Sequence, residues 1–153
     1  MSNSQQQFGV PGQTVARFNE HVEFLWGGDV TRIPMLQIGA VIDGTAREDN
    51  AALPTVLNSG LLMGKITASG KWKEYDPAAV DGSENVAGVL MYEHITVDPF
   101  TGANVENVSP ILVHGPLKTS ALRIEGSALI GHASEAATKT ALRAAGFFLD
   151  EDY

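Results

Sequence analysis

The sequence predicts an α+β fold, in which short β-strands form a small β-rich domain with one C-terminal helix and an extended N-terminal arm. Three observations support this prediction. The chain has 153 residues, the size of one domain with a buried core. After residue 29, short apolar stretches alternate with Gly, Pro, Asn and Asp, as in strands joined by turns. One late stretch has small apolar residues at helical spacing.

Residues 1–29 are predicted to form the arm and residues 30–153 the folded domain. The arm starts with a polar, glutamine-rich stretch and ends at Gly27-Gly28-Asp29, which indicates a turn. Six of its apolar residues are candidate anchors on a partner: Phe8, Val15, Phe18, Val22, Phe24 and Trp26. An ordinary N-terminal element that packs on the domain's own core is an equal alternative.

The domain is predicted to contain five strands and two further candidates. The five are Met35–Ile42, Leu61–Thr67, Lys71–Tyr75, Val86–Val97 and Ile111–Val113, and the two are Ala121–Glu125 and Ser127–Ile130. Asp43–Asn50 and Pro99–Asn107 are rich in turn residues, so they are expected to be loops. The stretch Asn50–Asn58 suits either a short helix or a linker.

The helix is predicted at Glu135–Ala145. Ser134 is the expected N-cap, and Gly146 is expected to end the helix in the left-handed conformation. The predicted apolar stripe consists of Ala137, Ala141, Leu142 and Ala145. After the helix, Phe147-Phe148-Leu149 is expected to be a short buried strand, with at least one phenylalanine in the core. The acidic segment Asp150–Tyr153 follows as a tail.

Charge and composition exclude several classes of partner. The net charge is -8 and the ten Lys and Arg are scattered, whereas nucleic-acid and anionic-membrane binders need a basic face. No cysteine is present, which rules out disulfides and zinc–thiolate sites. The N-terminus has neither the basic start nor the apolar stretch of a signal peptide, and no apolar run is long enough to span a membrane, so synthesis in a cytoplasm is expected.

Motifs for catalysis, metals and cofactors fail on inspection, so no enzyme activity, metal or cofactor is expected. The four histidines have no HExxH spacing, and no Gly-x-Ser-x-Gly elbow exists. Residues 60–65 carry their glycines one position too close for a phosphate loop, and Ile66 replaces the hydroxyl that binds magnesium. Residues 76–83 lack the alternating oxygen ligands of a calcium loop and are predicted to form turns.

Two alternative functions remain open at this point. Trp72 and Tyr75 stand beside Lys71 and Lys73, and exposed aromatic rings of this kind serve carbohydrate-binding or tail-associated virion modules. A small hydrolase or lyase with a site built from dispersed residues, such as His114 and Asp98, is the other alternative.

Residues 60–90 resemble the central block of the phage head decoration proteins, the family of the lambda capsid decoration protein. The matching positions are Gly64, Lys65, Thr67, Gly70, Lys71, Tyr75, Asp76, Pro77, Asp81, Gly82, Ala87 and Gly88. Residues 110–117 and 140–149 resemble the family's next strand, last helix and closing strand. The resemblance therefore covers roughly residues 34–149, and the long arm and acidic tail depart from it.

The resemblance implies a non-enzymatic cement protein. Such proteins bind the major capsid protein on the outer surface of the expanded head, form homotrimers and stabilise the shell against the packaged DNA. The resemblance carries over no catalytic residue. The arm anchors named above are then the expected capsid-binding residues.

Overall fold

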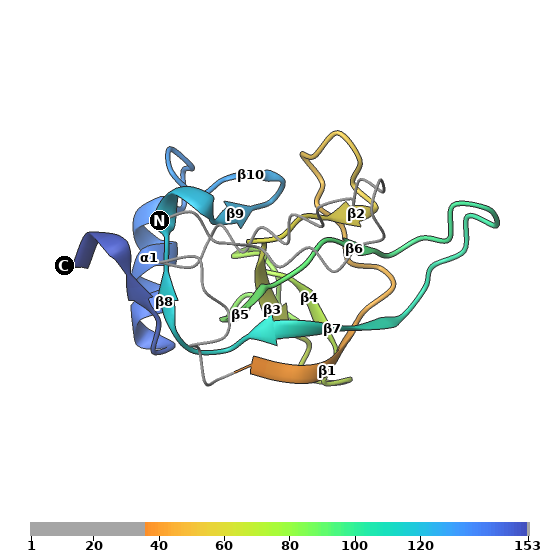
Figure 1. Cartoon of the computed structure of the whole chain (residues 1–153), viewed down its shortest axis with the longest axis horizontal. Helices are drawn as coiled ribbons and strands as arrows, with labels where there is room; N and C mark the ends of the chain where they lie inside the picture. The colour runs from red at the N-terminus through yellow and green to blue at the C-terminus, as the bar shows by residue number, and fades with distance from the viewer. Residues whose placement is uncertain (1–35, 153) are drawn as a thin grey trace, which may run out of the picture.

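The computed structural model describes residues 36–152. Five strands form a small closed barrel in the order β1-β4-β3-β5-β7 (Figure 1). Their bounds are β1 Leu36–Ile42, β3 Leu62–Lys65, β4 Trp72–Glu74, β5 Val86–Leu90 and β7 Asn107–Leu112. Antiparallel pairing joins all of these neighbours except β1 and β4, which meet in parallel at the single register position Ile42↔Trp72.

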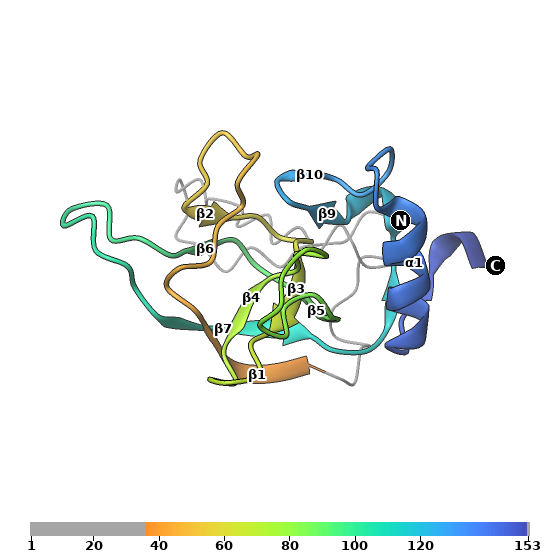
Figure 2. The same ribbon diagram turned by 180° about the vertical axis from the view of Figure 1, so that it is seen from behind.

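Three two-stranded sheets and the helical segments surround the barrel. β2 Val56–Leu57 pairs with β6 His94–Ile95, β9 Arg123–Ile124 with β10 Ser127–Ala128, and β8 Pro116–Leu117 in parallel with β11 Phe148–Leu149. The helical segments are η2 Thr119–Ala121, α1 Glu135–Ala144 and η3 Asp150–Asp152. Seen from both sides, α1 and the C-terminus lie at one end of the molecule and the β6–β7 connection projects from the other (Figures 1 and 2).

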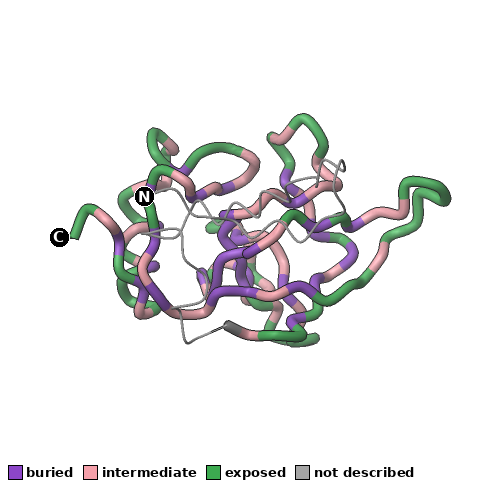
Figure 3. Tube along the Cα trace, in the orientation of Figure 1, coloured by how far each residue is buried: buried purple, intermediate pink, exposed green. Residues whose placement is uncertain are grey.

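Side chains of the barrel fill two adjoining core clusters. One lies within the barrel and contains Ile42, Trp72 and Ile111. The other lies between the barrel and the α1 end of the molecule and contains Leu142 and Phe147. The buried residues follow the strands at the centre of the molecule, whereas the projecting connection is mostly exposed (Figure 3).

Two glycines, Gly88 in β5 and Gly82 before it, lie where neighbouring atoms leave no room for a Cβ. A Cβ on Gly88 would lie 2.4 Å from Ile111 Cγ2 and 3.0 Å from Trp72 Cζ3. A Cβ on Gly82, which has φ of +110°, would lie 2.6 Å from the Lys65 carbonyl oxygen. The predicted turn at Asp81-Gly82 is therefore confirmed, and the chain can reverse there only because Gly82 has no side chain.

The predicted strands are confirmed in existence and corrected in their bounds. The stretch Val86–Val97 is not one strand, because β5 ends at Leu90 and β6 begins at His94. The strand expected at Ile111–Val113 begins earlier, at Asn107, because residues 107–112 pair with β1. The stretch Asn50–Asn58 forms turns and β2 rather than a helix.

The expected helix is present, but Ser134 lacks the predicted capping bond, and only Ala141 and Leu142 of the predicted stripe pack on the core. The Ser134 hydroxyl makes no capping hydrogen bond, because the Ser134 backbone (φ -93°, ψ 7°) lacks the extended conformation that directs an N-cap side chain toward the N–H groups of the first turn. Thr138 and Leu142 are the buried helix residues, whereas the predicted stripe residues Ala137 and Ala145 are exposed. Gly146 has φ of +94°, as predicted.

Candidate functional site

The six predicted arm anchors, Phe8, Val15, Phe18, Val22, Phe24 and Trp26, lie outside the described residues. The boundary between arm and domain at residue 29 also lies outside them. Both stay predictions. Within residues 36–152, three surface features suit a macromolecular partner.

The first feature is an exposed apolar patch on the β1–β7 face of the barrel. Val41 and Val108 are paired across the two strands, and their side chains are 40% and 62% exposed. Ile38 is 85% exposed and lies within a register irregularity between Gln37 and Ala40. Such an irregularity re-aims side chains of the strand. The patch lies on the strand with which the described chain begins.

The second feature is the hairpin between β6 and β7. The Val105 N–H donates to the Thr96 carbonyl at 2.9 Å, and the Asp98 N–H donates to the Ala103 carbonyl at 2.9 Å. Phe100 stands at the tip and is 95% exposed. This is the segment that projects at the end of the molecule away from α1 (Figure 1).

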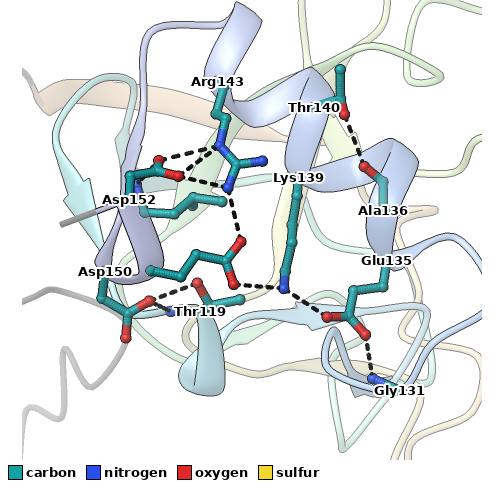
Figure 4. Close-up of polar contacts among 11 residues, drawn as sticks. Thr119, Gly131, Glu135, Ala136, Lys139, Thr140, Arg143, Asp150 and Asp152 are labelled. Carbon is teal, nitrogen blue, oxygen red and sulfur yellow. Dashed lines mark hydrogen bonds and ion pairs between the residues drawn. The ribbon is translucent and has the colours of Figure 1, made fainter.

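The third feature is the docked C-terminal segment. Arg143 of α1 donates to both Asp152 and Glu151, at 2.7 and 2.8 Å, and Lys139 joins Glu151 and Glu135 at 2.8 and 2.7 Å (Figure 4). These contacts hold the pKa of Asp152 below its usual value, chiefly through its hydrogen bond from Arg143. The predicted acidic tail is therefore η3, folded against the basic residues of α1.

The C-terminal segment η3 is also anchored to η2. Asp150 accepts hydrogen bonds from the Thr119 N–H and hydroxyl at 2.9 and 2.7 Å, and these bonds lower the pKa of Asp150. The neighbouring strand β11 has one buried and one exposed side chain, since Leu149 is 0% exposed and Phe148 is 46% exposed. The expectation that at least one phenylalanine lies in the core is confirmed by Phe147, which is 2% exposed.

The two aromatic residues on which the carbohydrate-binding alternative rested are not available at the surface. Trp72 and Tyr75 are 3% and 5% exposed, so both rings belong to the core and offer no stacking platform. Lys65 Nζ lies over the Trp72 ring at 5.8 Å from its centroid, which covers it further. The pattern of aromatics beside lysines is explained by packing.

The dispersed hydrolase site is not assembled either. Asp98 lies in the β6–β7 hairpin, where its carboxylate accepts the Phe100 and Thr101 N–H groups at 2.8 and 3.3 Å. His114 lies between β7 and β8, and its ring meets Phe148 edge-on, with centroids 5.7 Å apart. The hairpin and β8 stand at opposite ends of the molecule (Figure 1).

Burial raises the pKa of the Glu74 carboxyl to about 6. It accepts the Arg47 N–H at 3.0 Å and borders a hollow that Asp49, Asp76 and Glu125 also line. Within residues 36–152, no group of three or more His, Cys, Asp or Glu side chains is placed to hold a metal ion. No helix in that range is long and apolar enough to cross a membrane.

A comparison with protein families identifies the chain. Residues 43–146, more than half of the sequence, match the family of bacteriophage lambda head decoration protein D. The chain belongs to this family. Its place is therefore the virion capsid, and its family is a structural class of capsid protein rather than a class of enzymes. A search of curated proteins found no match.

The matched range can be placed on the structure of this decoration protein. It begins at Asp43, directly after β1, and ends at Gly146, two residues after α1. The exposed patch residues Ile38 and Val41, strand β11 and the docked segment η3 therefore lie outside it. The hairpin that carries Phe100 lies inside it. The sequence predicts only a loop here, and the signal it offers for a surface site is an aromatic residue, Phe100, among the turn residues Pro99 and Gly102.

Proposed function

We propose that this decoration protein binds the major capsid protein on the outer surface of the expanded head, as a homotrimer, and stabilises the shell. The observation that carries the proposal is the family match over residues 43–146. Synthesis in the host cytoplasm, followed by assembly onto the finished head, fits this role.

The charge of the chain supports an outward position. At -8, the protein is repelled by nucleic acid, whose binding requires Lys and Arg side chains that displace counterions from phosphates. A protein of this charge stays off the DNA while heads are filled. A cement also needs no cofactor and no catalytic group.

The arm is the proposed contact with the capsid. Its anchors, Phe8, Val15, Phe18, Val22, Phe24 and Trp26, precede β1, and the exposed side chains of Ile38 and Val41 would continue their apolar surface onto the body. An extended segment of this kind can lie along a neighbour or add a strand to its sheet. Three arms on one trimer would act together and offset the entropy that each arm loses on binding.

Deletion of residues 1–28 tests the arm. The truncated protein, which starts at Asp29, should keep its melting temperature and oligomeric state but lose most of its affinity for heads, because buried aromatic residues at interfaces are worth at least about 2 kcal/mol each. Binding of the full chain should persist at moderate salt, since the arm offers few charges to screen. A folded truncation that binds as tightly as the full chain would move the contact to the loops of the body.

The preference for the expanded shell is tested separately. Purified full-length protein is mixed with expanded and with unexpanded heads that lack it, and bound protein is measured after sedimentation. The proposal predicts saturable binding to expanded heads alone, and a higher melting temperature for the decorated heads. Equal binding to both forms, or binding with no gain in stability, contradicts it.

A further inference from the structure

The β6–β7 hairpin holds its tip in one conformation by hydrogen bonds of its own. The Gly102 N–H donates to the Asp98 carbonyl at 2.8 Å, and the Asp98 carboxylate accepts the Phe100 N–H at 2.8 Å. Gly102 has φ of +70°, which closes the turn. Arg47 ties the hairpin to the body, because its Nη2 donates to Asn104 Oδ1 at 2.7 Å. The tip is therefore organised before any partner binds.

The hairpin tip holds the Phe100 side chain out from the body of the protein. Single exposed apolar side chains are common on protein surfaces and need no explanation by themselves. Here the ring is 95% exposed at the end of a projecting hairpin, and residues 99–104 carry no charge. Aromatic anchors held in their bound conformation are typical interface hot spots, because little conformational entropy is lost when they dock.

The same chain offers a hollow that suits such a side chain. Its apolar lining comes from Ala51, Ala52, Leu53 and Val56, with Glu93 and Arg123 among the polar residues that complete it. The hollow measures about 420 Å³. A dry apolar cavity of roughly 150 Å³ already holds benzene, so the space is ample for a phenylalanine ring.

Hydrogen bonds hold the wall of this hollow in place. Asn50 Nδ2 donates to the Glu125 carbonyl at 2.7 Å, which joins the loop before β2 to the turn between β9 and β10. Gly126 packs so closely on this loop that a Cβ there would lie 2.4 Å from the Ala51 nitrogen. Leu53 remains 65% exposed in the hollow. The hollow, like the hairpin tip that carries Phe100, is therefore formed before any partner binds.

We propose that Phe100 of one copy occupies the hollow around Leu53 of the next copy in the homotrimer. The inference rests on the trimer of the proposed function and assigns its contact. The Phe100 tip and the hollow are different surfaces of the chain, so the contact between two copies is head-to-tail. Three such contacts close a ring when neighbouring copies are related by a threefold rotation. Copies that each carry a charge of -8 repel one another, which favours a contact through the uncharged tip and an apolar hollow.

Cysteine cross-linking tests the contact directly, because the natural chain has no cysteine. The double variant Phe100→Cys/Leu53→Cys should form disulfides between copies under mild oxidation and run as a covalent trimer. The matched control is Phe100→Cys/Val80→Cys, since Val80 is also 95% exposed but lies in the turn at residues 76–83. The control should give no covalent trimer.

A second variant, Phe100→Ser, separates the possible outcomes. It should keep the melting temperature of the folded chain, because the ring is exposed, and raise the dissociation constant of the trimer at least about tenfold. Trimers that form equally well without the ring and do not cross-link would overturn the contact and leave the trimer intact. Intact trimers that lose head binding would assign Phe100 to the capsid instead. Absence of trimers both in solution and on heads would overturn the proposed trimer itself.

Discussion

Replacement of Phe147 by alanine should destabilise the protein far more than the same change at Phe148. The side chain of Phe147 is 2% exposed and belongs to the core cluster that also contains Leu142, whereas Phe148 is 46% exposed and contacts the His114 ring. Truncation of a buried phenylalanine costs about 3–5 kcal/mol, since the apolar transfer and the remaining cavity both contribute. An edge-on aromatic contact is worth only about 0.5–1.5 kcal/mol.

The expected difference is large enough to read from melting curves. For a domain of this size, each kcal/mol shifts Tm by about 2–4 °C. Phe147→Ala should therefore lower Tm by roughly 6–20 °C, and Phe148→Ala by less than about 6 °C. Calorimetry and urea unfolding of both variants would check this. Equal losses, or a larger loss for Phe148→Ala, would refute the placement of the two rings.

Three further predictions concern stability. Gly88→Ala should strongly destabilise the barrel, by at least about 2 kcal/mol in urea unfolding, because its Cβ would lie 2.4 Å from the nearest side-chain atom; a parent-like midpoint would contradict this. Arg123→Ala should cost about 3 kcal/mol in the same assay, because it removes the 2.6 Å ion pair of the fully buried Glu48; a loss below 1 kcal/mol would contradict it. Since the pKa of Asp152 is lowered in the folded state, its stabilising effect is present above its ordinary pKa of 3.8 and is lost as the pH falls through the lowered value, so the stability difference between the parent and Asp152→Asn should shrink between pH 5 and pH 2; a constant difference would count against the docked tail.

Local signals in the sequence predicted much of the described fold. Glycines at positions 82 and 146 stand at the turn and the helix end that their spacing indicated. The apolar stretch before Thr67 and the one before Asp76 became β3 and β4, joined through Ala68-Ser69-Gly70. Each of these features depends on neighbouring residues, so a local pattern is sufficient.

Features that depend on distant residues were not predictable. Closure of the barrel requires Ile42 to meet Trp72, and no local pattern specifies that partner. The acidic tail folds back because Lys139 and Arg143 of α1 form ion pairs with Glu151 and Asp152. For the candidate site, the position of Phe100 among turn residues could be found in the sequence, whereas the hollow around Leu53 is assembled from three separate segments, residues 50–58, residue 93 and residues 123–126.

An image of decorated heads tests most directly whether this protein binds the outer capsid surface as a trimer. Expanded heads that lack this protein are saturated with the purified full-length chain, and their density is compared with that of the undecorated heads. We expect added density on the outer surface, at or near local threefold positions, with three copies in each site. Density inside the shell, a different symmetry at every site, or no added density would contradict it.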